Sequence, residues 1–260
     1  MSKAPEKQKP LSKFQIMRKA LIVGWACLGL MLTAGPLRAQ VQEDAGNTPH
    51  AKLSGEAFAF NLFASGSQYL FEEWVRGEVS LATGAVVKAE SLRYNGYLDE
   101  LIWLNPLGSM PVMVDKSLVS SFVLYGPHDR QPLVFEKISH RSWYASEPSQ
   151  IYAQVLYRGE MSLMAYRNIR KTGENTIYTE SGITVKENIS PSHEYFLLSP
   201  EGRVHQIRQF NRRTFRRLFP DHRTEIRQAL RGISIHTDAQ RVVFISRLDA
   251  LMYGRENGGQ

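Results

Sequence analysis

Cysteine is nearly absent from the sequence, because Cys27 is the only one among 260 residues. A lone cysteine cannot form a disulfide within the chain, and Cys27 lies in a segment that we expect export to remove. The remaining chain then has no thiol for nucleophilic catalysis, for a thiolate metal site or for an iron–sulfur cluster. In an oxidising compartment its stability must come from an ordinary hydrophobic core and not from disulfides.

The sequence also lacks the short motifs that mark common active sites. It contains no His-Glu-x-x-His pair, no Gly-x-Ser-x-Gly nucleophile turn, no phosphate-binding glycine loop and no dinucleotide fingerprint. Its histidines stand singly, without a second metal-ligand type at a suitable spacing: His50, His128, His140, His193, His205, His222 and His236. We therefore predict no metal and no cofactor, and favour a protein without catalysis. An enzyme whose site is assembled from distant residues is the alternative.

No long hydrophobic run marks a membrane-spanning helix. The apolar run near the N-terminus covers residues 20–34, which is 15 residues, whereas a bilayer span needs about 20. Six basic residues precede this run, and Pro36, Arg38 and Ala39 follow it. This layout predicts a secretory signal peptide over residues 1–39, cleaved after Ala39. We expect an exported protein, periplasmic or associated with the outer membrane. Retention as an N-terminal anchor and lipid attachment at Cys27 are the lesser alternatives.

The net charge of +7 is misleading about the mature chain. Residues 1–39 hold seven of the 32 basic residues and one of the 25 acidic residues, which leaves a net charge of +1 for residues 40–260. Residues 200–260 hold 12 arginines and 6 acids, whereas residues 40–199 hold 13 basic and 18 acidic residues. The mature protein is therefore a mildly acidic body with an arginine-rich C-terminal part.

The chain beyond residue 77 has the pattern of an antiparallel β protein. Short apolar runs recur between turn signals every 8–12 residues, which is typical of a meander, a sandwich or an open barrel. Asn95-Gly96 predicts a hairpin turn, since both residues tolerate a positive φ. Residues 168–192 predict a long hairpin arm or a loop, and residues 195–207 a second hairpin. The expected strands lie at residues 79–81, 86–94, 97–104, 112–114, 119–124, 133–135, 152–157 and 161–166.

Helical patterns occur only near the C-terminus. Phe215, Leu218 and Phe219 form an apolar stripe that Asn211 or Thr214 can cap, and residues 226–230 form the face of a second helix. A third helix is predicted from Asp238 as its cap to Gly254, with Val242, Ile245, Leu248 and Met252 or Leu251 inward. The fold class is thus α+β and mostly antiparallel β. Its parts are a signal (1–39), a flexible leader (40–56), a β domain (57–207) and packed helices (208–254).

An arginine-rich run is the clearest candidate binding site. Guanidinium groups alternate with aromatic rings over residues 208–217, and the candidate binding residues are Arg208, Arg212, Arg213, Arg216 and Arg217. Such a run suits a nucleic-acid strand, but export argues against that partner. Anionic lipid or lipopolysaccharide phosphates also match the arginine fork. The remaining interpretation is that the phenylalanines pack inward while the arginines coat the surface.

Two other polar groups are weaker candidates. Asp99 and Glu100 are an adjacent acid pair with apolar flanks, but neighbouring strand residues point to opposite faces of a sheet. We expect a solvated strand edge or turn there, and not an acid–base pair. Residues 140–144 combine His140 with an arginine, a serine and two aromatic residues. They can line a binding surface, although a packed loop is the better expectation.

Several spaced motifs together resemble those of a family of uncharacterised exported proteins of Bacteroidota. The early motifs are Glu-Val-Ser-Leu-Ala-Thr-Gly at residues 78–84, Leu-Arg-Tyr-Asn with Tyr-Leu-Asp-Glu-Leu at residues 92–101, and Val-Asp-Lys-Ser-Leu at residues 114–118. The later ones are Glu-Tyr-Phe-Leu at residues 194–197, Gly202, and Leu-Phe-Pro-Asp at residues 218–221. The resemblance covers about residues 70–252. It implies an exported β domain with a helical C-terminus, and it brings no activity and no catalytic residues.

These features together favour an exported envelope protein that acts by binding through a basic C-terminal face. Its partner would be anionic lipid or an envelope protein, and not nucleic acid. A hydrolase with a dispersed site, or a lipid carrier of the cell envelope, is the alternative.

Overall fold

The protein is described by a computed structural model over residues 53–59, 62–106, 110–127, 131–140, 149–180 and 182–254. The predicted signal peptide, most of the predicted leader, His50, His128 and residues 141–144 lie outside these ranges. Among the residues that the structure describes, no helix is both long enough and apolar enough to span a membrane.

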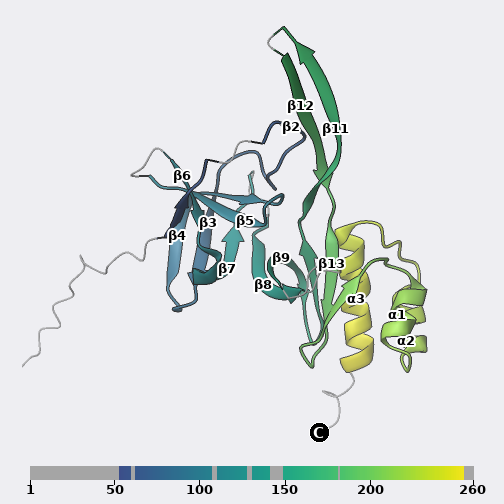
Figure 1. Ribbon diagram of the computed structural model, residues 1–260. Helices are drawn as coiled ribbons and strands as arrows, with labels where there is room; N and C mark the ends of the chain where they lie inside the picture. The colour runs from purple at the N-terminus through teal and green to yellow at the C-terminus, as the bar shows by residue number, and fades with distance from the viewer. Residues whose placement is uncertain are drawn as a thin grey trace, which may run out of the picture. The chain divides into compact units, whose positions relative to one another are not determined.

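One large antiparallel sheet dominates the described chain (Figure 1). Its eleven strands follow the order β1-β6-β5-β4-β3-β7-β8-β9-β10-β13-β14, so that most sequence neighbours pair as in a meander. This confirms the predicted mostly antiparallel α+β class. The strands are β1 (Gly55–Ala57), β3 (Val75–Leu81), β4 (Val86–Asn95), β5 (Glu100–Leu104), β6 (Pro111–Val114), β7 (Val119–Leu124), β8 (Leu133–His140), β9 (Ser149–Arg158), β10 (Ser162–Tyr166), β13 (Glu194–Leu198) and β14 (Val204–Ile207).

A second sheet is inserted between β10 and β13. It consists of the long hairpin β11 (Ile169–Thr179) and β12 (Gly182–Pro191), with β2 (Ala64–Ser65) pairing in parallel to β12. Of the two expectations for residues 168–192, the hairpin arm is therefore the correct one. Tyr178 and Ile183 face each other across this hairpin and are 78% and 69% exposed.

Alternating burial builds the core of the large sheet. On β3, Val75 and Val79 are buried, whereas Arg76 between them is exposed, as expected for a strand with one covered face. The rings of Phe122 and Phe135 stack at 4.7 Å, and Tyr152 meets Phe122 edge-on at 5.0 Å. These aromatic side chains are fully buried and make β7, β8 and β9 one hydrophobic unit.

Three helices follow the last strand: α1 (Arg212–Leu218), α2 (Arg223–Ala229) and α3 (Asp238–Tyr253). Helices as short as α1 and α2 are not stable alone in water, so they need tertiary contacts. A buried cluster supplies these contacts and joins all three helices to β10, β13 and β14: Met161, Leu163, Ala165, Tyr195, Leu197, Ile207, Phe215, Ile226, Ala229, Phe244, Ile245 and Leu248.

The helix caps agree only in part with the sequence prediction. Asn211 caps α1, as predicted, because its side chain accepts the N–H of Thr214 at 2.8 Å. The predicted cap of α3 was Asp238, and this is wrong. Thr237 is the cap, and its side chain and that of Gln240 form a reciprocal capping box. The Asp238 side chain is thereby left for other contacts.

The turn after β4 also differs from the prediction. Neither Asn95 nor Gly96 has a positive φ; the residue that has one is Asp99, with a φ of 59°. The Asn95 side chain instead accepts the N–H groups of Tyr97 and Leu98, each at 3.0 Å, and so stabilises a longer turn. Gly96 is required for close packing, because a Cβ there would lie 2.4 Å from the carbonyl oxygen of Arg167.

Candidate functional site

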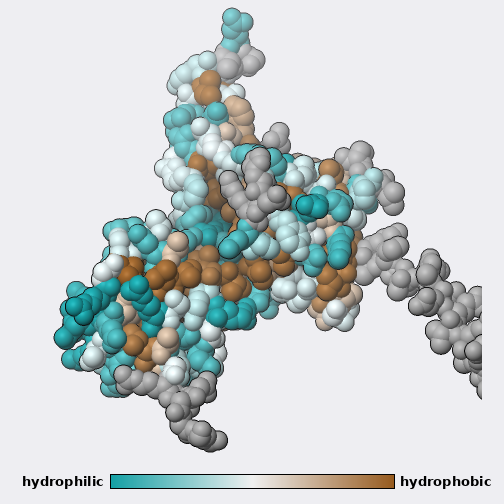
Figure 2. Space-filling model, turned by 180° about the vertical axis from the view of Figure 1, so that it is seen from behind, coloured by the Kyte–Doolittle hydropathy of each residue, from teal (hydrophilic) through white to brown (hydrophobic). Residues whose placement is uncertain are grey.

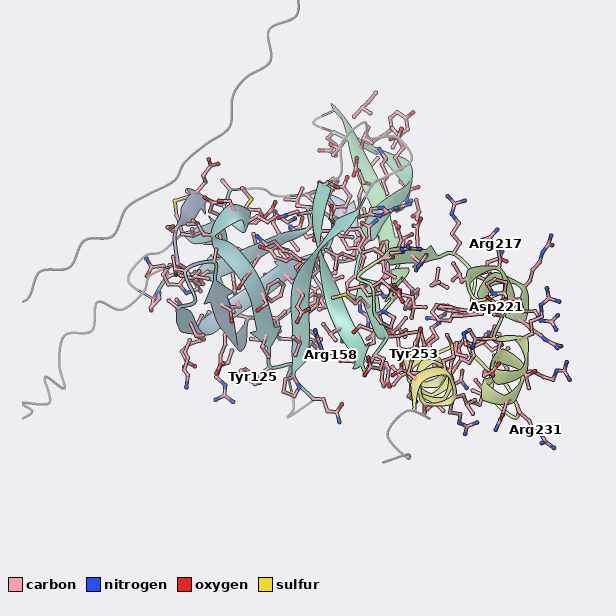
Figure 3. The ribbon with its side chains drawn as sticks, turned by 90° about the horizontal axis from the view of Figure 1, so that it is seen from below. Tyr125, Arg158, Arg217, Asp221, Arg231 and Tyr253 are labelled. Carbon is pink, nitrogen blue, oxygen red and sulfur yellow. The ribbon has the colours of Figure 1, made fainter. Side chains whose placement is uncertain are left out.

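The first part of the candidate site is the arginine face of α1. Phe215 is fully buried, while Arg212, Arg213 and Arg217 are exposed and Arg216 is half-buried. The predicted arrangement, with rings inward and guanidinium groups outward, is therefore confirmed. Figure 3 shows arginine side chains of this region, among them Arg217 of α1 and Arg231 after α2, directed away from the sheet.

Like charges accumulate between α1 and α2. Arg212 lowers the pKa of Arg216 most, and burial, Arg223 and Arg227 lower it further. The Nε atom of Arg216 is buried and has no hydrogen-bond partner within the described part of the chain. None of the ion pairs formed by the described residues involves an arginine of α1 or α2. Their positive charges are thus not neutralised by carboxylates of the same region.

A hollow of about 670 Å³ lies where β14 leads into α1. It brings together three of the five predicted binding residues, Arg208, Arg213 and Arg217, whereas Arg212 and Arg216 do not line it. Polar side chains supply the rest of its wall: Gln206, Gln209, Asn211 and Thr214. The five arginines therefore divide between this hollow and the face shared with α2.

A second hollow of about 500 Å³ shares three wall residues with the first, namely Gln206, Arg208 and Gln209. The other residues that line it belong to β13, β14 and α3 or lie next to these elements: His193, Glu194, Tyr195, Ile207, Phe210, Ile235, His236 and Arg241. Sequence analysis did not select Arg241, because it stands alone in a helical pattern, 24 residues beyond Arg217.

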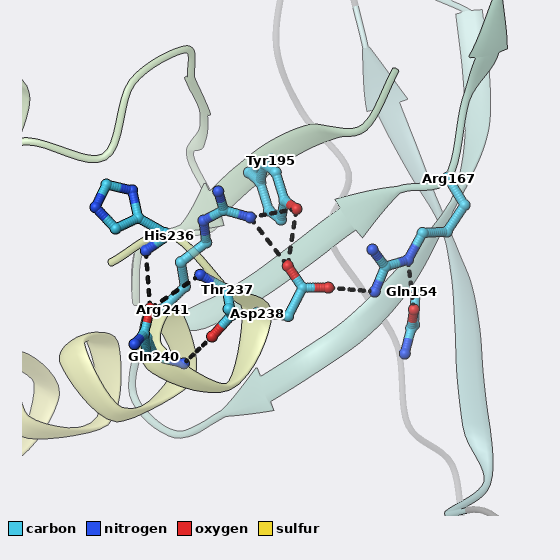
Figure 4. A network of polar contacts seen from close by, with 8 residues as sticks. All are labelled: Gln154, Arg167, Tyr195, His236, Thr237, Asp238, Gln240 and Arg241. Carbon is cyan, nitrogen blue, oxygen red and sulfur yellow. Dashed lines mark hydrogen bonds and ion pairs between the residues drawn. The ribbon is translucent and has the colours of Figure 1, made fainter. Parts of the chain in front are cut away.

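Arg241 is held in place by a polar network around Asp238 (Figure 4). The Asp238 carboxylate accepts hydrogen bonds from Arg167 at 2.7 Å, from the Tyr195 hydroxyl at 2.8 Å and from Arg241 at 3.0 Å. The Arg241 guanidinium also donates to the Tyr195 hydroxyl. Burial alone would raise the pKa of Asp238, but Arg167 and these hydrogen bonds bring that pKa below its usual value.

The sequence predicts a solvated strand edge or turn at Asp99 and Glu100; the turn forms at Asp99, but its carboxylate is not solvated. Asp99 lies in the turn but is only 6% exposed. Its carboxylate accepts from Lys116 Nζ at 2.6 Å, from the Tyr94 hydroxyl at 2.7 Å and from the Tyr152 N–H at 3.2 Å. Burial raises the pKa of Asp99, although Lys116 opposes that shift. The carboxylate thus has a structural role, because it joins β4, the segment between β6 and β7, and β9 through the turn.

The remaining polar candidates are residues 140–144 and the single histidines. Residues 141–144 lie outside the described residues, and the His140 ring meets Phe196 edge-on at 5.0 Å. No group of three or more His, Cys, Asp or Glu residues suited to a metal ion occurs within the described ranges. Burial and the nearby Arg167 lower the pKa of His193, so its imidazole is neutral at neutral pH.

Three comparisons with known proteins bear on the family of this chain. A scan against models of protein families finds no match, and searches of the curated proteins and of the solved structures find none either. The resemblance to exported proteins of Bacteroidota therefore rests on the sequence motifs alone and stays a prediction.

Proposed function

We propose that this protein is an exported envelope protein that acts by binding, and that the arginines of α1 and α2 dock it onto an anionic lipid surface. The observation that carries the proposal is the concentration of arginine charge without ion-pair partners on these two helices. Helices α1 and α2 together hold six arginines and one acid. Such a surface attracts phosphate-bearing lipids, because the guanidinium fork matches phosphate oxygens.

The local energetics support a role for these charges beyond solubility. Arg212 and Arg216, like Arg223 and Arg227, stand four residues apart on one helix. Like charges at this spacing destabilise a helix by about 0.2–0.5 kcal/mol per pair. The last-turn position of Arg216 and Arg217 offsets part of this cost through the helix dipole. A binding partner that carries negative charge would remove the remaining repulsion.

Vesicle co-sedimentation tests the proposal. We expect the mature protein to bind vesicles of equal parts phosphatidylglycerol and phosphatidylcholine, to bind pure phosphatidylcholine poorly, and to dissociate as salt is raised. The test variant reverses three exposed arginines: Arg212→Glu, Arg213→Glu and Arg217→Glu. Each arginine near an anionic membrane contributes about 1 kcal/mol, so this variant should bind about 100-fold more weakly or worse.

A matched control changes the net charge by the same amount elsewhere. Arg76→Glu, Lys88→Glu and Arg203→Glu replace three exposed cations on β3, β4 and the turn before β14. The control should keep most of the binding, because its substitutions lie outside α1 and α2. Equal losses in both variants would show that only net charge matters, and unchanged binding of the test variant would refute the docking face.

The export part of the proposal has its own measurement. The basic start, the apolar run of residues 20–34 and Ala39 support cleavage between Ala39 and Gln40. N-terminal sequencing of the protein from the envelope fraction should therefore begin at Gln40. An intact Met1 together with cytoplasmic recovery would contradict export.

A further inference from the structure

Two hollows lie next to each other beside β14, and we call them together the arginine groove. They share the wall residues Gln206, Arg208 and Gln209, so the first hollow, at the start of α1, adjoins the second, near the start of α3. Their volumes of about 670 and 500 Å³ each fall in the range of small-ligand sites, about 300–1,000 Å³. A flat bilayer cannot fill such a recess, whereas a narrow flexible chain can.

Arginines line both ends of the groove. Arg213 and Arg217 line the α1 end, Arg241 lines the α3 end and Arg208 lines both hollows. The one carboxylate among the lining residues is that of Glu194, which accepts from Arg170 and, at 2.6 Å, from the Gln206 amide. Arg241 is already paired with Asp238 at 3.0 Å, whereas Arg213 and Arg217 form no ion pair among the described residues. The α1 end of the groove therefore favours a ligand with negative groups.

Arg241 is held in a fixed position at the α3 end of the groove, where its guanidinium already bonds Asp238 and Tyr195. Its guanidinium carbon lies 4.3 Å from the Tyr195 ring centroid and 4.9 Å from that of Phe210, so two rings restrain it. Its Nε atom is buried and has no hydrogen-bond partner among the described residues. Buried donors are normally paired, and leaving one unpaired is unfavourable. A carboxylate, sulfate or phosphate oxygen would satisfy this donor once it displaced the side chains that cover the atom.

Side-chain amides supply the neutral recognition groups. The Asn211 amide donates to the Gln209 carbonyl oxygen at 3.1 Å, which leaves the Gln209 NH₂ group without a partner within the described part of the chain. Gln206 bonds in the opposite direction, because its NH₂ group donates to the Glu194 carboxylate at 2.6 Å. Amides carry both donors and acceptors, as is needed to bind hydroxyl groups. Arginines and amides side by side therefore suit a hydroxyl-rich anion.

The aromatic rings of the groove are not arranged as a platform for nucleic-acid bases. Base stacking needs an open ring face. The Tyr195 and Phe210 rings meet edge-on at 5.3 Å, and the Arg241 guanidinium covers a face of each. Phe210 also contacts the buried Phe215 at 5.8 Å. These rings hold the arginine, so the groove chemistry favours a saccharide over a nucleic-acid strand.

We propose that the arginine groove binds an acidic saccharide, a short sugar chain that carries carboxylate, sulfate or phosphate groups. The acid groups contact the arginines, and the sugar hydroxyls contact the amides of Gln206 and Gln209. This site goes beyond the proposed lipid docking, because it lies in a recess and uses residues of β14 and α3 that the face of α1 and α2 does not contain.

Isothermal titration calorimetry at low salt with tetragalacturonate, and with neutral maltotetraose as the matched control, tests the site. We expect tetragalacturonate to bind and maltotetraose to bind at least about tenfold more weakly, since it offers no acceptor with a charge. Single-stranded DNA of four nucleotides serves as a third probe. Equal binding of both sugars, or tighter binding of the DNA, would overturn the proposal.

Paired variants separate the groove from the lipid face. Arg208→Ala with Gln209→Ala should weaken tetragalacturonate binding at least about tenfold and leave vesicle binding nearly unchanged. Arg223→Glu with Arg227→Glu should do the reverse, because these residues do not line the groove. Loss of vesicle binding alone would refute only the lipid proposal, and sugar binding that survives the groove variant would refute only this one.

Substitutions at His236 test the groove at a position where the fold should not be disturbed. His236 is exposed, lines the α3 end of the groove, and uses its backbone N–H and not its ring to bond Gln240. His236→Ala should therefore keep the thermal unfolding midpoint of the unaltered protein. His236→Glu at the same position places a carboxylate in the groove and should weaken tetragalacturonate binding further than His236→Ala. Identical affinities for the two variants would count against an anion in the groove.

Discussion

The carboxylate of Asp249 on α3 accepts the backbone N–H of Met161 at 2.8 Å. The same carboxylate accepts the N–H of Glu160 at 3.1 Å and the hydroxyl of Tyr157 at 2.8 Å. Asp249 is only 6% exposed, so these bonds form away from water. They attach α3 to the turn between β9 and β10, and they fix one wall of the core that supports the arginine helices.

Replacing Asp249 by alanine should destabilise the protein strongly. The change leaves two backbone N–H groups and a tyrosine hydroxyl without partners, and each buried unpaired group costs about 1–3 kcal/mol. We expect the free energy of unfolding to fall by about 3 kcal/mol or more, measured by urea denaturation. Asp221→Ala is the control, since Asp221 is exposed, and its effect should stay within about 0.5 kcal/mol. A loss of less than about 1 kcal/mol in Asp249→Ala would contradict the role of this carboxylate.

Gly96→Ala should also destabilise the protein, because the added Cβ would clash with neighbouring atoms and not because of the backbone conformation. The new Cβ would lie 2.4 Å from the Arg167 carbonyl oxygen and 3.1 Å from the Ile169 side chain. Separating the two segments also strains the bond from the Ile169 N–H to the Gly96 carbonyl oxygen, which is 3.0 Å long. We expect a loss of about 2–3 kcal/mol in urea denaturation.

Gly84→Ala provides the comparison for this glycine. Gly84 has a φ of 87° and nothing within 4 Å of its Cβ position, so its substitution costs only backbone strain, about 1–2 kcal/mol. Hydrogen exchange adds a second readout: Gly96→Ala should speed exchange of the Ile169 amide, and Gly84→Ala should not. Equal exchange in both variants would refute a close approach at Gly96.

Local patterns were enough to predict most elements of this fold. The β13–β14 hairpin follows from two apolar runs around Ser199, Pro200, Glu201 and Gly202, and Gly202 has the positive φ that such a turn uses. The stripe of α1 follows from Phe215 and its neighbours in the same way. In both cases the information lies within one turn or one helix, so that a short window of sequence contains it.

Contacts between distant segments were not predictable in this way. On α3 the sequence pattern placed Val242 inward, whereas Phe244 and Asp249 are buried and Val242 is half-buried. Asp249 is buried because backbone N–H groups 88 and 89 residues earlier meet it. Sequence patterns do not show which backbone amides will meet a distant carboxylate, and they do not show the close packing that requires Gly96. Arg241 joined the candidate site through Tyr195, 46 residues away, for the same reason.

The buried pair of Asp99 and Lys116 gives a prediction about which partner matters more. Their side chains are 9% and 23% exposed. Asp99→Ala removes the acceptor for Lys116, for the Tyr94 hydroxyl and for the Tyr152 N–H, and should cost about 3 kcal/mol. Asp99→Asn keeps a hydrogen-bond acceptor, and asparagine tolerates the positive φ. In urea denaturation it should therefore lower the free energy of unfolding less than Asp99→Ala does. A larger loss for the asparagine variant would contradict this account.

Lys116→Met should lower the free energy of unfolding by an amount that depends on pH. Burial already raises the pKa of Asp99, and Lys116 is the main group that opposes this shift. Without Lys116 the folded-state pKa rises further above the unfolded value of about 3.9. A carboxyl with a raised pKa costs stability once it ionises, so the loss should be small near pH 4 and grow as the pH rises through the folded pKa. Urea denaturation at several pH values would show this, and a loss independent of pH would refute it.

Asp238 should show the opposite dependence on pH. Although burial opposes it, Arg167 together with the bonds from Tyr195 and Arg241 lowers the pKa of Asp238 in the folded protein. Its charge therefore contributes stability that is fully present above the unfolded pKa of about 3.9 and is lost as the pH falls through the folded pKa. The difference in unfolding free energy between the unaltered protein and Asp238→Asn should be fully present at pH 7. Burial lowers the pKa of the nearby His193 whereas Asp238 raises it, so this imidazole adds its own contribution to the difference as the pH falls towards 5.

That difference should shrink when urea denaturation is repeated at pH 3, because both proteins then approach the same charge at this position. Other carboxylates titrate equally in both proteins and cancel in the comparison. Asp221→Asn, which changes an exposed carboxyl outside the network, should show a difference near zero at every pH. A difference for Asp238→Asn that stays the same at pH 3, or grows there, would mean that Asp238 is not stabilised as an ion and that Arg241 is oriented by its two rings alone.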